Sequence, residues 1–279
     1  TGVVDALGPG TSGIEVGQRV AVNGNTGCGT CDSCRRGYPL LCSSLQCLGV
    51  NGPGGFAECM LAPAANIFPV DDLPVEVAVM TEPTACAMHG MDVLGMRPGS
   101  DVLLFGAGPT GLLLAQLLLH GGAARLTVAA PTEYKLELAT SFGVDETVLI
   151  DRHDAAAGAA RVRRLAPDGF DVVIDATGAS GVTQQALELT KDRGTVLIYG
   201  VTGQADRIAL SPYDVYRREL TIKGSFAQVS SFQGAIAMLR SGRVRTEGII
   251  THRFPLDRFA DALEAVQRDE RCHKAVMVP

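Results

Sequence analysis

The sequence predicts an α/β protein centred on a doubly wound parallel sheet. From about residue 100, short apolar runs alternate with segments of helical spacing, and a glycine-rich loop separates the first run from the first helix. The runs are apolar at successive positions, which indicates strands buried on both faces of a helix-covered parallel sheet. Because crossovers in such sheets are right-handed, few arrangements other than the doubly wound one remain.

Each element of this sheet is predicted from its own pattern, and further elements follow near the carboxyl end. The predicted strands are 102–105, 126–130, 147–150, 172–175, 195–199, 220–226, 249–252 and 275–278. The predicted helices are 109–119, 133–141, 232–239 and 257–267.

The first 70 residues differ from the rest, because they are rich in glycine and proline and contain short β-type runs at 18–22 and 56–60. Many turns between short strands indicate a compact β region. Helical spacing begins at about residue 75 and continues to residue 91, which predicts one helix there.

Composition limits the classes of function. Hydrophobic residues make up 46% and charged residues 19% of the 279, which indicates a large core. The net charge of −6 argues against a nucleic-acid partner, since neutralising phosphates requires a basic surface. The apolar run 111–119 is too short to cross a bilayer, so no membrane partner is expected. Eight cysteines without a visible secretion signal favour a reducing compartment, and we expect the cytoplasm.

Four cysteines form the most specific motif of the chain, with the spacing Cys-x2-Cys-x2-Cys-x7-Cys. They are Cys28, Cys31, Cys34 and Cys42. Thiolates so close together can bind one Zn²⁺ in a tetrahedron from a single loop. A disulfide framework is the first alternative, but a chain of this size buries enough apolar surface to be stable without disulfide bonds. A nucleic-acid-binding zinc module is the second, and only Arg35 and Arg36 beside the cysteines favour it. We predict a structural zinc site.

A G-x-G-x-x-G loop follows the strand 102–105 and opens the next helix, which is the context of a dinucleotide-binding loop. The first glycine makes the tight turn, the second lets the backbone approach a pyrophosphate, and the third lets helix and strand pack closely. The helix N-terminus supplies N–H groups to the phosphates. The candidate coenzyme-binding residues are Gly106, Gly108, Pro109, Thr110 and Gly111.

The end of the second strand predicts which coenzyme binds. An acidic residue that binds the ribose of NAD is expected there, about 20 residues after the loop, but Ala130 occupies the place. Thr132 and Lys135 follow and offer a hydroxyl and a cation to a 2′-phosphate, so NADP is favoured over NAD. Two alternatives remain: Glu133 can take the role of the acid, and Lys135 can be an ordinary solvated lysine.

A four-cysteine lobe followed by a dinucleotide loop resembles the zinc-containing medium-chain alcohol dehydrogenases, especially their polyol (sorbitol-like) branch. The resemblance is collinear over essentially the whole chain. The supporting stretches are 17–20, 54–58, 82–83, 171–178 and 218–225. It implies a GroES-like catalytic domain built from residues 1–82 and 227–279, with a Rossmann domain of residues 83–226 inserted, and a homodimer or homotetramer.

The resemblance also implies a second, catalytic zinc, and Glu82 of the Glu82-Pro83 pair matches one of its ligands. The family's catalytic cysteine and histidine fall upstream of Thr1, so we expect that an amino-terminal piece is missing and that this chain lacks a complete catalytic site. Glu82 is alternatively an acid favoured by a helix N-terminus. We expect His89 to serve helix packing. The remaining cysteines are expected to be buried small hydrophobes: Cys47, Cys59, Cys86 and Cys272.

Other family positions concern the coenzyme. Thr177 and Gly178 match the stretch beside the nicotinamide ribose, Val201 follows the fifth strand, and Ser225 lies where backbone groups meet the carboxamide. Lys274 resembles a residue that touches the pyrophosphate, or is an ordinary exposed lysine. Some sorbitol dehydrogenases carry a polyol-binding arginine where this chain has Ala227-Gln228, so sorbitol itself is not expected as the substrate.

The expected function is zinc-dependent hydride transfer between a secondary alcohol or polyol and NADP or NAD. The alternative is a non-catalytic NAD(P)-binding protein, or an inactive fragment without the catalytic cysteine and histidine.

Overall fold

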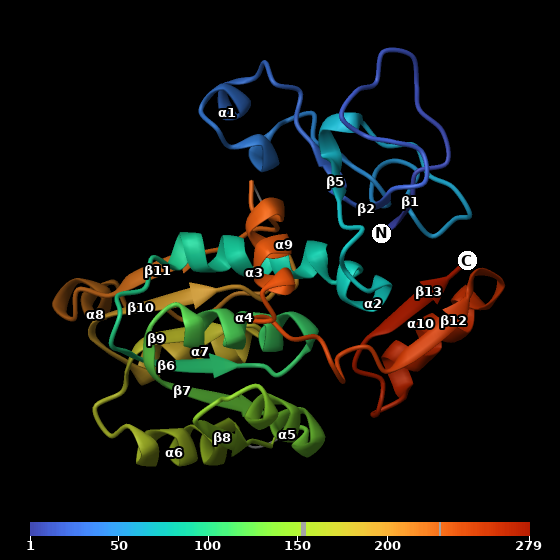
Figure 1. Cartoon of the computed structure of the whole chain (residues 1–279). Coiled ribbons are helices and arrows are strands. Elements are labelled where there is room, and N and C mark those ends of the chain that lie inside the picture. The colour runs from blue at the N-terminus through green and yellow to red at the C-terminus, as the bar shows by residue number, and fades with distance from the viewer. Residues whose placement is uncertain (152–154, 229) are drawn as a thin grey trace. The chain divides into compact units, whose positions relative to one another are not determined.

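A six-stranded parallel sheet with the strand order β11-β10-β9-β6-β7-β8 organises residues 87–226 (Figure 1). The structure is a computed structural model that describes residues 1–151, 155–228 and 230–279. The strands are β6 (Ser100–Phe105), β7 (Ala123–Ala130), β8 (Glu146–Leu149), β9 (Phe170–Asp175), β10 (Thr190–Ile198) and β11 (Thr221–Gly224). The chain starts in the middle of the sheet and works outward in both directions, which confirms the predicted doubly wound order.

Helices connect these strands and cover the sheet. They are α3 (Thr81–Leu94), α4 (Pro109–His120), α5 (Glu133–Ser141), α6 (Ala155–Leu165), α7 (Ser180–Leu189) and α8 (Pro212–Arg217). Leu103 and Phe105 of β6 pack in one cluster with Val162 of α6 and Ala186 of α7. Leu104 points to the opposite face and is 0% exposed. Both faces are therefore buried, as the continuously apolar strands predict.

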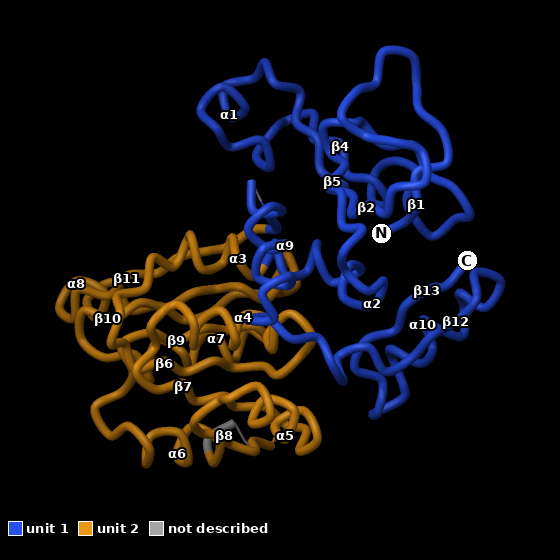
Figure 2. The backbone as a smooth tube through the Cα atoms, in the orientation of Figure 1, with its two compact units in different colours: residues 1–86, 227–279 blue, residues 87–226 orange. Residues whose placement is uncertain are grey.

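The chain divides into two compact units, which Figure 2 colours separately. The first unit combines residues 1–86 and 227–279, and the second comprises residues 87–226. The boundary falls within α3, so one continuous helix contributes to both units.

The first unit contains small sheets and short helices. Strands β1 (Gly2–Val3), β2 (Arg19–Val22) and β5 (Ile67–Pro69) form an antiparallel sheet in the order β1-β2-β5. Two further pairs are β3 (Asn25–Thr26) with β4 (Gln46–Cys47), and β12 (His252–Pro255) with β13 (Ala275–Val278). The helices are α1 (Asp32–Arg35), α2 (Val75–Ala78), α9 (Phe232–Arg240) and α10 (Phe259–Arg268), with 3-10 turns η1 (Pro39–Leu41), η2 (Ala64–Asn66) and η3 (Leu256–Arg258).

The single helix predicted from residue 75 to residue 91 is wrong, because the structure has two. Helix α2 ends at Ala78 and α3 begins at Thr81. Pro83 explains the break: it has no N–H to donate to the carbonyl of Val79, and its ring would clash with that carbonyl in a continuous helix. In the first turn of a new helix, the proline is tolerated.

Two predicted strands also differ. Residues 56–60 form bends rather than a strand, since none of the described residues pairs with them, and an extended segment needs a partner for its hydrogen bonds. The predicted strand 249–252 starts later, at His252. Ile249 donates its backbone N–H to Thr246 at 3.1 Å, so that part of the run closes a turn.

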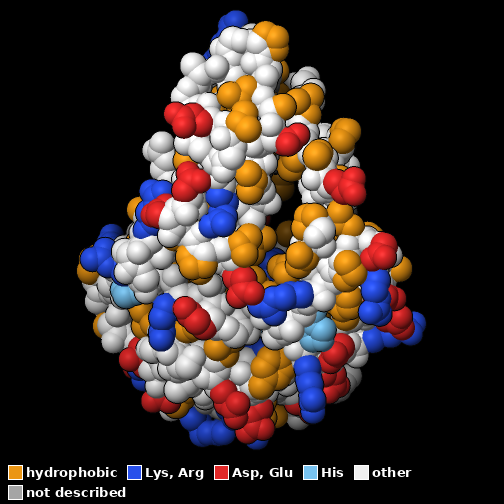
Figure 3. Space-filling view, turned by 45° about the vertical axis from the view of Figure 1, so that its right-hand side comes forward, with side chains coloured by type: hydrophobic (Ala, Val, Ile, Leu, Met, Phe, Trp, Pro, Cys, Tyr) orange, Lys and Arg blue, Asp and Glu red, His pale blue; other side chains and the backbone are white. Residues whose placement is uncertain are grey.

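Acidic and basic side chains alternate over the face shown in Figure 3, without a large area of one sign. None of the described helices has the length and apolar character needed to cross a membrane.

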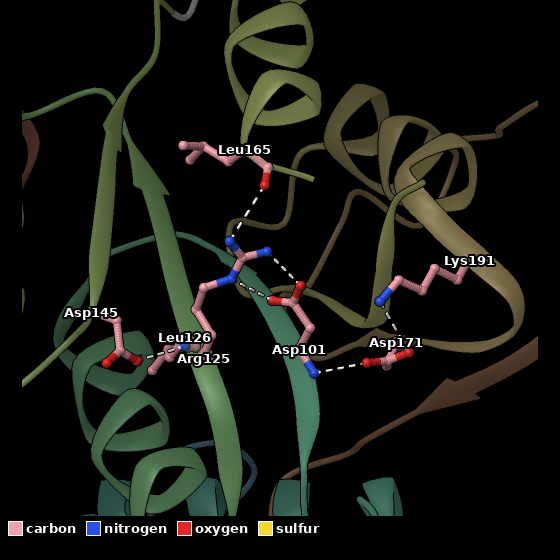
Figure 4. Close-up of polar contacts among 7 residues, drawn as sticks. All are labelled: Asp101, Arg125, Leu126, Asp145, Leu165, Asp171 and Lys191. Carbon is pink, nitrogen blue, oxygen red and sulfur yellow. Dashed lines mark hydrogen bonds and ion pairs between the residues drawn. The ribbon is translucent and has the colours of Figure 1, made fainter. Parts of the chain in front are cut away.

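A polar network joins the amino ends of four strands of the large sheet (Figure 4). Arg125 of β7 forms an ion pair with Asp101 of β6 and donates to the carbonyl of Leu165 at 3.3 Å. Asp101 donates its backbone N–H to Asp171 of β9 at 2.8 Å, and Asp171 pairs with Lys191 of β10 at 3.3 Å. The network therefore connects the strands at their amino ends, whereas the glycine loop lies at the carboxyl ends.

Replacing Arg125 by methionine should lower the free energy of unfolding by about 1–2 kcal/mol, because Asp101, whose side chain is 19% exposed, loses its ionic partner. Urea unfolding followed by circular dichroism measures the change. The control Arg268→Met breaks a pair in which the arginine is 78% exposed and should cost less than about 0.5 kcal/mol. Equal losses in the two variants would contradict a structural role for the network.

Candidate functional site

The structure brings the four cysteines of the motif together. Their sulfur atoms all lie within 4.8 Å of one another, and no other group of three or more histidine, cysteine or acidic ligands forms among the described residues. A tetrahedral zinc with sulfur at 2.3 Å needs sulfur atoms about 3.8 Å apart, so the cluster fits a zinc ion after small adjustments. All four are free thiols, which disfavours the disulfide alternative. The cysteines that the structure brings together are the predicted candidates for zinc ligands: Cys28, Cys31, Cys34 and Cys42.

Backbone N–H groups point at the sulfur atoms and favour thiolates. Cys28 donates to Cys42 at 3.3 Å, Cys31 donates to Cys28 at 3.3 Å, and Cys34 donates to Cys31 at 3.5 Å. Hydrogen bonds from the side chain and backbone of Thr30 lower the pKa of Cys28 to about 5. Burial raises the pKa of Cys34 to about 12. A bound cation would favour the thiolate of both residues.

Of the three glycines in the loop between β6 and α4, one has room for a side chain and two do not. Gly106 has a φ of 108°, and a Cβ on Gly111 would lie 2.3 Å from the carbonyl oxygen of Gly106, so neither position accepts a side chain. A Cβ on Gly108 would meet no atom within 4 Å. Pro109 and Thr110 form the first turn of α4. This pattern fits a loop that leaves room for a pyrophosphate at Gly108.

The loops after β9 and β10 meet backbone to backbone at the same edge of the sheet. A Cβ on Gly178, whose φ is 74°, would lie 2.4 Å from the carbonyl oxygen of Val201. A Cβ on Gly200 would lie 2.3 Å from the backbone nitrogen of Gly178. Val201 is 89% exposed beside this contact.

The carboxylate of Asp175 holds the loop after β9. It is 0% exposed and accepts hydrogen bonds from the backbone N–H of Thr177 at 2.8 Å and from its hydroxyl at 2.6 Å. The hydroxyl of Thr183 donates to the second oxygen at 2.5 Å. Because three donors satisfy the buried charge, Thr177 and Gly178 have a defined conformation.

The end of β7 offers no acid. Ala130 is its last residue and is 1% exposed. Thr132 is the N-cap of α5, but its side chain forms no capping bond, so the hydroxyl is not used by the helix. Lys135 lies one turn further, with its ammonium 5.7 Å from the ring centre of Tyr134, and Glu133 is exposed in the first turn.

Ser225 directly follows β11, and its buried hydroxyl has no hydrogen-bond partner among the described residues, while its backbone N–H donates to Ile198 at 3.0 Å. An unpaired buried hydroxyl is costly, so a ligand that pairs with it gains affinity.

Glu82 lies in the first turn of α3 and is exposed. The thiol of Cys86 donates to its Oε1 at 3.2 Å. Burial lowers the pKa of Lys274, and the charge of Glu82 opposes this shift, so the two residues interact within the first unit. Burial also lowers the pKa of His89, which is half-buried two helical turns after Glu82. Apart from Cys86, the described residues place no histidine, cysteine or acidic ligand in a group with Glu82, so they do not form a complete catalytic zinc site.

Sequence reasoning missed three residues at these sites. Asp175 is the last residue of the apolar strand β9, and Gly200 follows the apolar strand β10. Their positions at the carboxyl ends of buried strands could have identified them. Cys86 was predicted to be a buried hydrophobe, but it is half-buried and bonds Glu82, for which the spacing of four residues on a helix is the signal. The prediction for Cys59 is wrong, because it is exposed. Cys272 is buried as predicted.

Comparison with known proteins agrees with both halves of the sequence interpretation. Residues 1–72 match the alcohol dehydrogenase GroES-like domain, and residues 109–241 match the zinc-binding dehydrogenase domain.

Individual proteins are similar over the whole chain. D-arabinitol dehydrogenase 1 of Uromyces fabae is 39% identical over 279 residues, which are 100% of this chain and 80% of the relative. A zinc-binding dehydrogenase from Sinorhizobium meliloti 1021, solved bound to NADP, has a TM-score of 0.92 and 31% identity, and the match covers 100% of this chain and 81% of that one. A protein of Escherichia coli CFT073 named as a short chain alcohol dehydrogenase, complexed with NADH, has a TM-score of 0.91 and 27% identity, with 100% and 82% covered.

Purified protein should contain zinc at one ion per four-cysteine cluster, measured by plasma mass spectrometry. Cys34→Ser should remove that ion, because three thiolates and a hydroxyl bind zinc far more weakly than four thiolates. The control Cys59→Ser changes an exposed cysteine outside the cluster and should retain the zinc. Retention of zinc in Cys34→Ser would disprove the site.

Two glycine variants distinguish a glycine that the packing of the fold requires from one that coenzyme binding requires. Gly111→Ala should lower the free energy of unfolding by about 1–3 kcal/mol, because its Cβ overlaps a carbonyl oxygen. Gly108→Ala should change stability by less than about 1 kcal/mol but weaken coenzyme binding at least about tenfold. Thermal unfolding and NAD(P)H fluorescence titration measure the two effects. Undiminished binding by Gly108→Ala would contradict the pyrophosphate position.

Proposed function

Because the chain belongs to the family of zinc-binding alcohol dehydrogenases, we propose that it oxidises a polyol at a secondary alcohol and that its coenzyme is NADP. Family membership makes the protein an NAD(P)-dependent oxidoreductase. The relatives give no support to a non-catalytic nucleotide-binding protein. The polyol part rests on the 39% identity to a D-arabinitol dehydrogenase.

The main observation behind the proposal is the free space beside Gly108 in the glycine loop. Gly108 leaves space at the N-terminus of α4, where N–H groups and the helix dipole favour phosphate. The residues at the same edge of the sheet that we propose to line the coenzyme are Gly106, Pro109, Thr110, Gly111, Thr177, Gly178, Val201 and Ser225. Bound NADP supplies the hydride acceptor for the carbinol carbon.

The preference for NADP follows from the end of β7. Ala130 places no carboxylate beside the ribose, so a 2′-phosphate meets no repulsion there. The hydroxyl of Thr132, which does not cap the helix, and the ammonium of Lys135 can both donate hydrogen bonds to phosphate oxygens. Glu133 is the opposing charge and limits the preference.

For zinc, the proposal distinguishes two roles. The four-cysteine cluster binds a structural ion that holds the lobe together. Glu82 is proposed as a ligand of the catalytic ion, but no group of three or more ligands that includes it forms among the described residues. We therefore derive no chemical step through that ion. Lys274 is proposed to contact the pyrophosphate.

The same family membership supports three further proposals. The catalytic domain comprises residues 1–82 and 227–279, and the coenzyme domain comprises residues 83–226. The protein forms a homodimer or homotetramer. It acts in the cytoplasm on a small molecule, with neither nucleic acid nor membrane as a partner.

Fluorescence titration should show that NADPH binds at least about tenfold more tightly than NADH. Lys135→Ala should weaken NADPH about tenfold and leave NADH nearly unchanged, whereas Ala130→Asp should favour NADH because a carboxylate repels the 2′-phosphate. Equal affinity of the unaltered protein for both coenzymes would disprove the NADP preference. Reduction of NADP by the zinc-loaded protein with D-arabinitol, compared with 2-propanol, tests the polyol.

A further inference from the structure

The hydroxyl of Thr183 forms an unusual hydrogen bond for a threonine in a helix. Such a hydroxyl commonly donates to the carbonyl four residues earlier, and those of Thr84, Thr140 and Thr190 do so at 2.6–3.0 Å. Thr183 of α7 is 4% exposed and instead donates to Oδ2 of Asp175 at 2.5 Å, outside its own helix. This hydroxyl therefore connects α7 to the last residue of β9.

Four hydrogen bonds close a ring around the loop between β9 and α7. The hydroxyl of Thr177 donates to Oδ1 of Asp175 at 2.6 Å and accepts the backbone N–H of Ala179 at 3.1 Å. The carbonyl of Ala179 accepts the backbone N–H of Thr183 at 3.2 Å. The hydroxyl of Thr183 completes the ring at the other oxygen of Asp175. Thr183 thus binds both the start of α7 and the carboxylate.

The loop that this ring holds is the direct neighbour of the glycine loop. A Cβ on Gly106 would lie 3.2 Å from Cγ2 of Thr177 and 3.1 Å from the carbonyl oxygen of Ala176. The backbone N–H of Ala176 donates to Phe105, the last residue of β6, at 2.9 Å. Because β9 and β7 flank β6 on opposite sides, the loop lies on the side of the glycine loop away from β7.

The strand order indicates which half of the coenzyme this loop meets. The middle of the sheet has the order β10-β9-β6-β7. We have proposed that the adenosine ribose lies at the end of β7 and the pyrophosphate at Gly108, after β6. A dinucleotide lies across the carboxyl edge of such a sheet. Its second half, which carries the nicotinamide, therefore continues from β6 over β9 and β10.

We infer that Thr183 is a positioning residue for the nicotinamide half of the coenzyme. Thr183 is buried and acts through the carboxylate of Asp175 on the loop at Thr177 and Gly178, whereas Thr177 is exposed at the edge of the sheet. The inference rests on the proposed function, because it requires a dinucleotide at this edge.

The physical reason is the buried charge of Asp175. Without the hydroxyl of Thr183, Oδ2 of this carboxylate loses a donor, and loop conformations that give the oxygen access to water become more favourable. A coenzyme that binds only the ordered loop then binds more weakly, in proportion to the fraction of molecules in which the loop is ordered.

The test compares Thr183→Val with the matched control Thr190→Val. Each change replaces a hydroxyl by a methyl group and keeps the branched shape of the side chain. Thr190 is 2% exposed, and its hydroxyl donates to the carbonyl of Ala186 at 2.6 Å, near the amino end of β9. Both variants lose one buried hydrogen bond and should unfold several degrees below the unaltered protein.

Calorimetric titration with two ligands distinguishes the halves of the coenzyme. One ligand is NADPH, and the other is adenosine 2′,5′-bisphosphate, which has the adenosine half and lacks the nicotinamide half. Thr183→Val should bind NADPH about tenfold more weakly than the unaltered protein but bind the bisphosphate with unchanged affinity. Thr190→Val should bind both ligands with unchanged affinity.

Two further variants make the test independent of the folding of Thr183→Val. Thr183→Ser keeps the hydroxyl donor and should bind NADPH within about twofold of the unaltered protein. If circular dichroism shows that Thr183→Val is unfolded, Thr177→Val takes its place, because Thr177 is exposed and its hydroxyl donates to the other oxygen of Asp175. It should show the same selective loss of NADPH affinity.

Three results would overturn the inference. They are equal NADPH affinities of Thr183→Val and Thr190→Val, losses of the same size for NADPH and the bisphosphate, and no recovery in Thr183→Ser. All three leave the proposed function intact, since the unaltered protein still binds NADPH. If the unaltered protein binds neither NADPH nor NADH, the proposed function fails and the inference fails with it. If NADH proves to be the coenzyme, NADH and AMP replace the two ligands.

Discussion

One buried carboxylate, that of Asp175, determines the edge of the sheet on which the proposed coenzyme site depends. Its side chain accepts from Thr177 and Thr183, and its backbone carbonyl accepts from Tyr199 at 2.9 Å and Gly200 at 2.7 Å. The loops after β9 and β10 are thus joined through one residue. A buried charge without hydrogen-bond donors costs several kcal/mol, and the loss of a single hydrogen bond to it costs about 1–3 kcal/mol. Conformations of these loops that break the hydrogen bonds to Asp175 are therefore strongly disfavoured.

The two edges of the sheet are stabilised by different means. At the amino ends of the strands, long charged side chains such as Arg125 and Lys191 connect neighbouring strands through ion pairs. At the carboxyl edge, glycines such as Gly111 and Gly200 bring backbones so close that no side chain fits. Backbone contacts stabilise this edge and keep it free of bulky groups, which leaves room for a ligand.

The large sheet and the four-cysteine cluster could be predicted from the sequence because both are local signals: apolar strands of regular spacing, and ligands within 15 residues of chain. Pro83 is also a local signal for the break between α2 and α3, but the apolar spacing across residues 75–91 predicts one helix. Contacts between distant residues could not be predicted. Gln228 and Asn23 are 205 residues apart, and Asp101 and Arg125 pair only because the sheet places their strands side by side.

The division of the first unit into two chain segments has a consequence for synthesis on the ribosome. All the strands of the large sheet lie within residues 87–226 and can pair as soon as that stretch emerges. The first unit must wait, because it combines residues 1–86 with residues 227–279, as the ion pairs Asp72–Arg240 and Glu76–Arg253 illustrate. At about 5–20 residues per second, the delay is on the order of ten seconds. During that time the amino-terminal segment lacks its partner segment, and we expect early zinc binding to the cysteine loop to stabilise it.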